Sequence, residues 1–237
     1  MLRVATWNVL APAYAHPHRY AGVASDDLAP GTRTPRVHDR LRELLADSDV
    51  VAVQEADAAL VTWLREEVGA SVVHAPRPAA SDGVLLASTG VELVGDTGVT
   101  GDGRRTWAAA AVGDVLVVAV HLDPQWPAKH LAGAAQAREV GAWVDARSSG
   151  AVVVLGDLNA AWSSRTGDVL RHSGFEAISA GATAATNGRC RELDVVAARG
   201  CAVVALTPPD LPPVGSELWL PDADIPSDHA PLCAVVD

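Results

Sequence analysis

Cysteine and long apolar runs are scarce in this sequence. The three cysteines, Cys190, Cys201 and Cys233, lack the paired spacing of a zinc site or a disulfide framework, so we expect small buried thiols in a reducing compartment. No run approaches the roughly 20 apolar residues that a membrane span needs, and polar residues interrupt the first ten positions too early for a signal-peptide core. We therefore expect a cytoplasmic protein with no membrane partner.

Positive charge is also in deficit, because 18 Lys and Arg residues stand against 29 Asp and Glu residues, for a net charge of −11. Such a molecule repels polyanions, which disfavours long nucleic acid as a tightly held partner. A local pair such as Arg104 and Arg105 can still bind a substrate phosphate, because salt screens exposed charges beyond about 10 Å. The alternative is an exposed hairpin pair.

Several catalytic motifs are absent. The sequence has no G-x-S-x-G elbow, no P-loop and no H-E-x-x-H motif, which argues against the hydrolase classes that depend on them. No Gly/Ser linker, charge block or low-complexity tract divides the chain either. With 237 residues, 49% of them hydrophobic, we expect one domain over residues 1–237 and, with no stable protein partner evident, a monomer.

What the sequence does contain is an alternation of short valine-rich runs with amphipathic segments, which favours an α/β fold. The runs have the length and β-branched content of buried strands, and the amphipathic segments place apolar residues at helical spacing. A stretch rich in Pro, Gly, Asp and His, residues 15–35, predicts a long surface loop. The predicted strands are 3–6, 50–53, 83–87, 115–120, 152–155, 193–197 and 232–236, and the predicted helices are 34–46, 58–68, 131–144 and 166–172.

Four of the predicted strands end in polar residues: Asn8, Glu55, His121, and the pair Asp157 and Asn159. Strand ends at one edge of a sandwich bring together residues that are distant in sequence and hold them rigidly. The pattern therefore predicts a single convergent site.

Glu55 follows a buried strand, where a carboxylate is costly to desolvate unless a cation or hydrogen-bond donors offset the cost. Mg²⁺ usually takes one or two protein carboxylates and completes its shell with waters and phosphate oxygens, so Glu55 with a nearby Asn amide is a sufficient set of ligands. The alternative is that Glu55 caps the following helix.

Asp157 and Asn159 in G-D-L-N share one side of the chain if the backbone stays extended, and could orient a water and donate to a phosphate. The alternative is a simple turn, which does not exclude the catalytic interpretation. Ser227-Asp228-His229 and Asp194 add an imidazole that a carboxylate could keep protonated at neutral pH.

Taken in order along nearly the whole chain, these motifs resemble the endonuclease/exonuclease/phosphatase superfamily. The segments that carry the resemblance are T-W-N at Asn8, Q-E at Glu55, D-G-V-L-L from Asp82, H-L at His121, G-D-L-N at Asp157, L-D at Asp194 and S-D-H at Asp228. The resemblance implies a four-layered α/β/β/α sandwich of two mixed, mainly antiparallel sheets, as in DNase I.

Within the superfamily, W-N-V-L-A-P-A-Y, then Arg36 or Arg40, then D-V-V-A-V-Q-E resembles the branch that contains the CCR4, nocturnin and Angel proteins. That branch includes poly(A) deadenylases, a nicotinamide-dinucleotide phosphatase and RNA-end cyclic phosphatases. Its members commonly have an Arg three residues before a Gln that follows the H-L motif, whereas here Gln136 is preceded by Gly133. The missing basic residue argues against a polynucleotide substrate.

The resemblance also implies roles for individual residues. Glu55 would hold Mg²⁺, or Mn²⁺ as the alternative cation, with Asn8 and Asp228. Asp157 and Asn159 would position the attacking water. The remaining implied catalytic residues are His121, Asp194 and His229, of which His229 would contact the scissile phosphate, Asp194 would orient His229, and His121 would lie across the phosphate as a stabiliser or proton donor.

The function that follows is hydrolysis of a phosphate ester in a nucleotide, a dinucleotide or a short RNA end by in-line attack of water. Trp126, Tyr14 and Tyr20 could stack a nucleobase or could equally pack their loops against the body. An abasic-site type of DNA endonuclease is the enzymatic alternative and would need a basic groove. The alternative of another class is a catalytically silent protein that binds a nucleotide or a partner.

Overall fold

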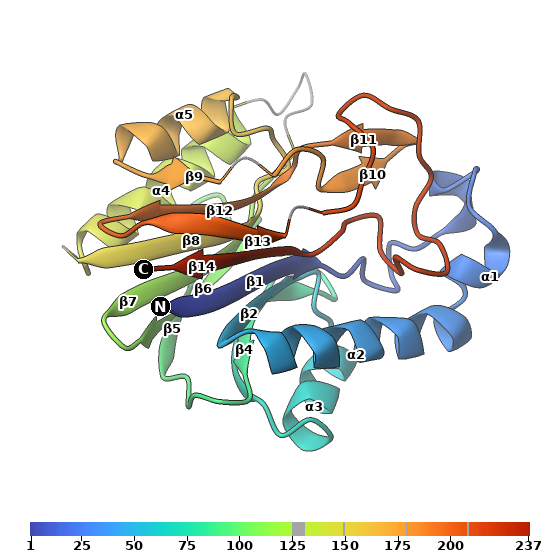
Figure 1. Ribbon diagram of the computed structural model, residues 1–237, viewed down its shortest axis with the longest axis horizontal. Helices are drawn as coiled ribbons and strands as arrows, with labels where there is room; N and C mark the ends of the chain where they lie inside the picture. The colour runs from blue at the N-terminus through green and yellow to red at the C-terminus, as the bar shows by residue number, and fades with distance from the viewer. Residues whose placement is uncertain (125–130, 149, 179, 208) are drawn as a thin grey trace.

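Two six-stranded sheets packed face to face form the centre of the computed structural model (Figure 1), which describes residues 1–124, 131–148, 150–178, 180–207 and 209–237. The first sheet has the order β13 (Val203–Thr207), β14 (Leu232–Val236), β1 (Leu2–Asn8), β2 (Val50–Gln54), β4 (Gly83–Ser88), β3 (Ser71–Pro76). The second has the order β5 (Gly95–Val99), β6 (Thr106–Val112), β7 (Val115–His121), β8 (Ala151–Asp157), β12 (Asp194–Arg199), β9 (Glu176–Ala177).

Both sheets are mixed and mainly antiparallel, as expected. In the first sheet β1 pairs with β2 in parallel, and in the second β7 pairs with β8 in parallel. The neighbouring pairs, among them β1 with β14 and β8 with β12, are antiparallel. The two parallel pairs matter for function because parallel strands end at the same edge of a sheet.

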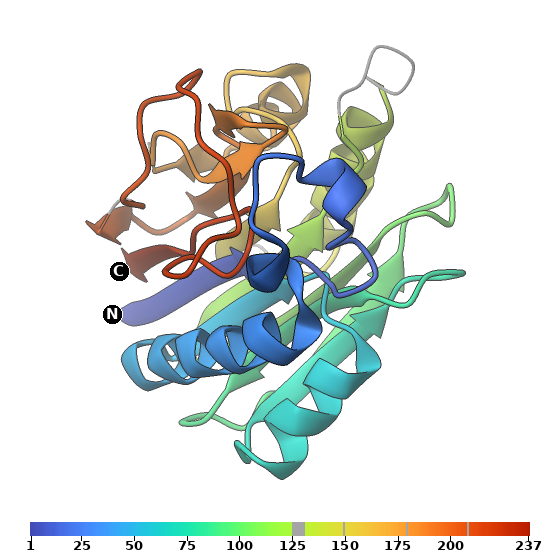
Figure 2. The same ribbon diagram turned by 90° about the vertical axis from the view of Figure 1, so that its right-hand side faces the viewer.

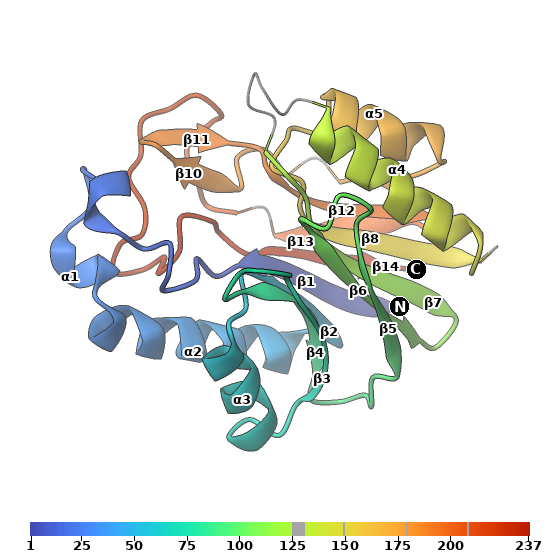
Figure 3. The same ribbon diagram turned by 180° about the vertical axis from the view of Figure 1, so that it is seen from behind.

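Helices cover the outer faces of both sheets, which gives four layers (Figure 1; Figure 3 from behind). Helices α2 (Pro30–Asp47) and α3 (Ala58–Glu66) pack on the first sheet, and α4 (Ala132–Asp145) and α5 (Arg165–His172) pack on the second. Outside these layers lie the small sheet of β10 (Ala184–Thr186) and β11 (Arg189–Arg191) and the short helices η1 (Pro17–Arg19) and α1 (Ser25–Leu28). The predicted fold class is confirmed.

Three apolar layers hold the sandwich together. The layer between the sheets contains Val4, Ala52 and Leu86 from the first sheet and Val117 and Leu155 from the second. The two outer layers join each sheet to its helices. Because the central strands are buried on both faces, their sequences are continuous apolar runs. Each fully buried aliphatic side chain contributes roughly 1.5 to 3 kcal/mol to the stability of the fold.

The segment predicted as a long loop, residues 15–35, is partly helical, so that prediction was wrong in part. It contains η1, α1 and the first six residues of α2, which begins at Pro30 rather than at residue 34. Proline in the first helical turn costs no hydrogen bond and has the helical φ angle already set, which lets the helix begin there. The buried residues Leu28 and Arg33 then fix this segment to the body.

No helix within the described ranges combines the length and the apolar character needed to cross a membrane. All three cysteines are free thiols, but only Cys190 is buried, while Cys201 and Cys233 are half-buried. The expectation of three buried thiols therefore holds for one of them.

Candidate active site

A cleft of about 580 Å³ lies at the edge where β1, β2, β7 and β8 end. In Figure 1 β1 runs towards the right, and Figure 2 looks onto that side of the molecule. The cleft contains seven of the eight predicted catalytic and metal-binding residues: Asn8, Glu55, His121, Asp157, Asn159, Asp228 and His229. The predicted convergence of the strand ends is therefore what the structure has.

Asn8 connects the ends of the two sheets. Its amide nitrogen donates to Asp157 Oδ2 at 3.1 Å and to Glu55 Oε1 at 3.4 Å, while its Oδ1 accepts the Leu10 N–H. Glu55 also accepts the Ala11 N–H at 2.9 Å through its other carboxylate oxygen. The amide of Asn8 thus lies between two carboxylates from different sheets.

Glu55 does not cap the next helix, which was the alternative interpretation. The N-cap of α3 is Asp57, whose side chain accepts the Leu60 N–H at 2.8 Å. Glu55 instead has a left-handed backbone, with a φ of 59°, a conformation that costs energy for a side chain of this kind. This conformation accompanies a carboxylate that lines the cleft rather than one that serves the helix.

Burial, together with the neighbouring carboxylate of Asp228, raises the pKa of Glu55 to about 7, while the Ala11 N–H opposes the shift. Burial likewise raises the pKa of Asp228, whose Oδ2 accepts the Tyr20 hydroxyl at 3.1 Å. Two carboxylates with neutral partners are therefore held close together. Hard oxygen donors arranged in this way fit a hard divalent cation, which would offset the cost of their burial.

Asp157 lies between two histidines in opposite protonation states. His121 Nε2 lies 3.5 Å and His229 Nε2 lies 3.8 Å from the same Oδ2 atom of Asp157. Burial lowers the pKa of His121 well below its usual value, and Arg105 and Arg77 lower it further, so His121 is neutral at neutral pH.

His229 titrates in the opposite direction. Burial alone would lower its pKa, but the charges of Asp194 and Asp157 and the hydrogen bond that its Nδ1–H donates to Asp194 raise it well above the usual value. His229 Nδ1 lies 2.8 Å from Asp194 Oδ2, and the Trp7 indole N–H donates to the His229 carbonyl at 2.8 Å. A cationic imidazole in a fixed orientation therefore faces the cleft.

Burial raises the pKa of Asp157 to about 6, with Asp194 adding to the shift and His229 opposing it. The Asn159 N–H donates to Asp157 Oδ1 at 2.7 Å, and Asn159 has a φ of 51°. The segment is therefore a turn that also presents both side chains to the cleft, so the turn does not exclude the catalytic interpretation.

Gly156 is required where this turn begins. Its φ is 140°, and a Cβ atom there would lie 2.0 Å from the carbonyl oxygen of Val120 on β7. Only glycine allows β8 to approach its parallel neighbour so closely. The glycine thus sets the position of Asp157, which pairs in register with His121.

Asp157, Asp194 and His229 also offer possible metal-ligand atoms within 4.8 Å of one another. A histidine must be deprotonated to bind a metal, whereas His229 is held protonated by two carboxylates. The oxygen-rich group of Glu55 and Asp228 is therefore the better candidate metal site.

The predicted substrate-binding residues have different positions. Arg105 is buried and lines the cleft, with its Nε donating to Asp123 Oδ1 at 2.8 Å. Arg104 pairs with the other oxygen of Asp123 at 2.8 Å but is exposed and does not line the cleft. Trp126 lies outside the described residues.

Close packing at Gly133 explains why the position three residues before Gln136 has no arginine. A Cβ atom at Gly133 would lie 2.7 Å from the Asp123 carbonyl oxygen, so this position has no room for a side chain. Gln136 itself is buried, and its side chain accepts the Asp123 N–H and donates to the carboxylates of Asp123 and Asp102. Arg105, in the loop directly before β6, supplies a cation beside Asp123 instead.

Three cleft residues had no predicted role or an ambiguous one. Tyr20 is buried in an apolar cluster that includes Leu28. The Tyr14 hydroxyl donates to Asp82 Oδ1 at 2.9 Å. Both contacts support the packing interpretation of these tyrosines. Arg77 lines the cleft and pairs with Asp82 at 2.8 Å. The D-G motif at Asp82 was one of the segments that carry the family resemblance, but nothing in the sequence singled out Arg77.

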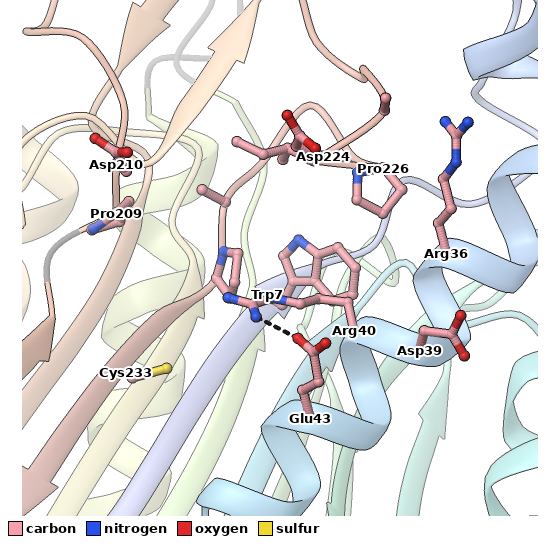
Figure 4. Close-up of a pocket in the computed structure, with 14 residues that line it drawn as sticks. Trp7, Arg36, Asp39, Arg40, Glu43, Pro209, Asp210, Asp224, Pro226 and Cys233 are labelled. Atoms are coloured by element: carbon pink, nitrogen blue, oxygen red, sulfur yellow. Dashed lines mark hydrogen bonds and ion pairs between the residues drawn. The ribbon is translucent and has the colours of Figure 1, made fainter.

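Figure 4 shows a second cavity, of about 560 Å³. Trp7, Arg40 and Glu43 line it together with Pro226, which lies close to Asp228 in the sequence. Figure 4 labels Trp7 and Arg40 among the lining residues, and Arg40 is paired with Glu43 on α2. The segment from Pro226 to Pro231 borders this cavity at both ends and carries two cleft residues in between.

Comparison with known proteins agrees with this architecture. The model of the Endonuclease/Exonuclease/phosphatase family matches residues 5–229. No match was found among curated protein sequences.

Similar solved structures include ANGEL2, a 2′,3′-cyclic phosphatase, in complex with adenosine-2′,3′-vanadate, with a TM-score of 0.79 and 14% identity over 98% of this chain and 94% of that one. The human Nocturnin catalytic domain with bound sulfate has a TM-score of 0.65 and 16% identity over 100% and 94% of the two chains. The Bacteroides thetaiotaomicron mannosyl-6-phosphatase Bt3783 has a TM-score of 0.68 and 15% identity over 100% of both. At these identities the likeness shows a shared fold.

The chain belongs to the endonuclease/exonuclease/phosphatase family, since the family model covers almost all of it. It is accordingly a hydrolytic phosphoesterase.

Proposed function

We propose that this chain hydrolyses a phosphate ester of a nucleotide, a dinucleotide or an RNA end, with a bound Mg²⁺ ion for which Mn²⁺ can substitute. The active unit is a single domain formed by residues 1–237, acting as a monomer in the cytoplasm. The observation that carries the proposal is the charge pattern around Asp157, where the cationic His229 and the neutral His121 flank one carboxylate oxygen.

Glu55 and Asp228 would hold the divalent ion, together with Asn8, whose amide already lies beside Glu55. A hard cation fits these residues because, within the described residues, the hydrogen-bond partners of their carboxylates are neutral groups of Asn8, Ala11 and Tyr20. When bound, the ion would supply a positive charge for the non-bridging phosphate oxygens and for the departing oxygen.

Asp157 accepts a proton from the attacking water, because its raised pKa of about 6 makes it a usable base near neutral pH. Asn159 fixes that carboxylate through its N–H and through its amide, which lies 3.2 Å from Asp157 Oδ2. The water oxygen forms a bond to phosphorus, the ester P–O bond breaks on the opposite side, and the leaving oxygen takes a proton from solvent.

His229 donates from Nε2 to the phosphate, where negative charge grows in the transition state. Asp194 holds the imidazole through Nδ1, so His229 keeps both its proton and its orientation. His121 is neutral in the free enzyme, so it serves as a hydrogen-bonding stabiliser and not as a cationic proton donor.

Two features support a small or terminal nucleotide substrate over a long polynucleotide. The chain has a net charge of −11, and the packing at Gly133 leaves no room for an arginine at that position of α4. ANGEL2, which shares the fold, was crystallised with adenosine-2′,3′-vanadate, which makes terminal phosphate chemistry a reasonable first substrate class.

The test is a panel of NADP⁺, an RNA end with a 2′,3′-cyclic phosphate, oligo(A), an abasic duplex and simple phosphomonoesters, each assayed with Mg²⁺ and with EDTA. We expect turnover of a nucleotide or an RNA end that needs the cation and that falls by at least about 100-fold in Asp157→Ala. Turnover that survives EDTA would overturn the metal-assisted mechanism. Turnover of the abasic duplex alone would replace the proposed substrate class.

A further inference from the structure

Arg105 carries hydrogen-bonding capacity that the described part of the protein does not use. Its side chain is 9% exposed and lies against the buried Asp123 carboxylate. The Nη1 atom has no hydrogen-bond partner among the described residues. Because an unmade bond of a buried cation is costly, a guanidinium with a free nitrogen beside a cleft is a strong candidate for ligand binding.

Arg77 has the same arrangement in a different loop, directly after β3. Its Nη2 pairs with Asp82 Oδ1 at 2.8 Å and also donates to the Tyr14 hydroxyl, while its Nε is buried without a partner among the described residues. Asp82 is buried, so Arg77 is held as rigidly as Arg105 is. Each arginine therefore has one nitrogen fixed by a buried carboxylate and another that is unsatisfied.

The two arginines come from neighbouring hairpins of the two different sheets. Arg77 follows β3, and Arg105 precedes β6. The Thr106 hydroxyl donates to the Ala75 carbonyl at 2.9 Å, which joins these two hairpin ends directly. Each arginine is thus within two residues of the same inter-sheet hydrogen bond.

Neither arginine neutralises the catalytic carboxylates. Their ion pairs within the described ranges are with Asp82 and Asp123, and not with Glu55, Asp157 or Asp228. Both nevertheless line the same cleft as Asp157, and both act on His121 by lowering its pKa after the larger effect of burial. Their position is therefore beside the reacting centre and separate from it.

We infer that Arg77 and Arg105 together bind a second anionic group of the substrate, next to the scissile phosphate, so that the preferred substrates are nucleotides that carry two separate phosphate groups. This inference rests on the proposed function for the identity of the scissile group. Guanidinium groups match phosphate oxygens in geometry and in charge, and two of them fixed in advance lose little entropy on binding.

The test measures binding and hydrolysis separately. Calorimetric titration with Mg²⁺ compares adenosine 2′-monophosphate with adenosine 2′,5′-bisphosphate, adenosine 3′-monophosphate with adenosine 3′,5′-bisphosphate, and inorganic phosphate with pyrophosphate. The wild type should bind the doubly charged member of at least one pair about 10-fold more tightly or better. The double variant Arg77→Gln/Arg105→Gln should reduce that ratio to within about 2-fold.

Arg199→Gln is the matched control. Arg199 is another partly buried arginine in an ion pair, 2.5 Å from Asp145, but it lies at the end of β12 far from Asp194 and the cleft. It should keep the wild-type ratio even if it lowers the melting temperature. Arg77→Lys/Arg105→Lys, which keeps both charges, should retain part of the preference and guards against a double variant that fails to fold.

Two outcomes would overturn the inference. One is equal affinity for both members of every pair in the wild type. The other is a double variant that weakens both members of a pair equally, which would place the arginines on the scissile phosphate itself. Hydrolysis of a substrate with a single phosphate, bis(p-nitrophenyl) phosphate, is measured in parallel with Mg²⁺, so failure of the proposed function is seen independently of the binding ratios.

Discussion

His229 Nδ1 lies 2.8 Å from Asp194 Oδ2, and both side chains are almost fully buried. The other Asp194 oxygen has no hydrogen-bond partner among the described residues, so this carboxylate is committed to the histidine. A buried pair of this kind fixes which nitrogen faces the substrate and whether it carries a proton. The pair therefore controls both the orientation and the charge of the group that faces the cleft.

Asp194→Asn should lower the pKa of His229, because the substitution removes the charge that most strongly raises it. In the wild type, the stability contributed by protonated His229 is fully present below a pH of about 6.5 and is lost as the pH rises through the higher folded-state pKa. In the variant, the alkaline limb of the activity profile should move to lower pH and activity at pH 7.5 should fall by roughly 100-fold or more. NMR titration of the His229 ring measures the shift directly, and an unchanged pKa would contradict the assignment.

The metal-free protein should lose stability as the pH rises from about 4.5 to about 7, where Glu55 ionises in the folded state. A carboxyl group with a raised folded-state pKa binds its proton more tightly when folded, so folding is favoured at the lower pH. The expected loss is on the order of a few kcal/mol at most. Urea unfolding in EDTA at pH 5 and at pH 7.5 measures it.

Glu55→Gln is the control for that experiment, because glutamine has a similar shape and cannot ionise. The variant should lose much of the pH dependence, and the remainder would belong to Asp157, Asp228 and His229, whose pKa values are also raised. Added Mg²⁺ should stabilise the wild type at pH 7.5 and should stabilise the variant much less. Equal pH dependence in both proteins would show that Glu55 is not the titrating group.

Trp7→Phe should reduce catalysis more than substrate binding. The indole N–H donates to the His229 carbonyl, and a phenyl ring keeps the apolar packing but leaves that buried carbonyl unpaired. We expect kcat to fall several-fold with little change in KM, together with a loss of about 1 to 3 kcal/mol of stability. A drop in stability without any effect on kcat would show that Trp7 has no role in placing His229.

Gly133→Ala should destabilise the protein by about 1 to 3 kcal/mol, because the new methyl group would lie 2.7 Å from the Asp123 carbonyl oxygen. Gly141→Ala, in the same helix, meets only the Ser173 hydroxyl at 3.3 Å and should be neutral or stabilising through its higher helix propensity. Thermal unfolding of both variants tests the comparison. Equal effects would mean that the close packing at Gly133 is not what excludes an arginine there.

The sequence predicted the strands that are buried on both faces, because their apolar runs are uninterrupted. It did not predict β3, which is half-buried, or β5, which has the sequence G-D-T-G-V and is exposed at four of its five positions. Strand β6 was missed for another reason, since the alanines of T-W-A-A-A-A-V carry no strand signal. Partner strands select such segments, and a single sequence does not record the partners.

The site could be predicted to the same extent and for similar reasons. Asn8, Glu55 and Asp157 could be found because each follows an apolar strand, which is a local signal. Arg77 and the Asp123 carboxylate could not, because their importance arises from ion pairs and from two hairpin ends that meet in space. The protonation states of the histidines also depend on burial, which no local pattern gives.

The contacts that complete the site join opposite ends of the chain. The Ser227 hydroxyl donates to the Asn8 carbonyl at 2.6 Å, and Trp7 bonds to His229 across 222 residues. At about 5 to 20 residues per second, a ribosome makes the second partner roughly 10 to 45 s after the first. A nascent chain therefore carries an incomplete site until His229 has been made, and phosphoesterase activity can report that β14 has joined the first sheet.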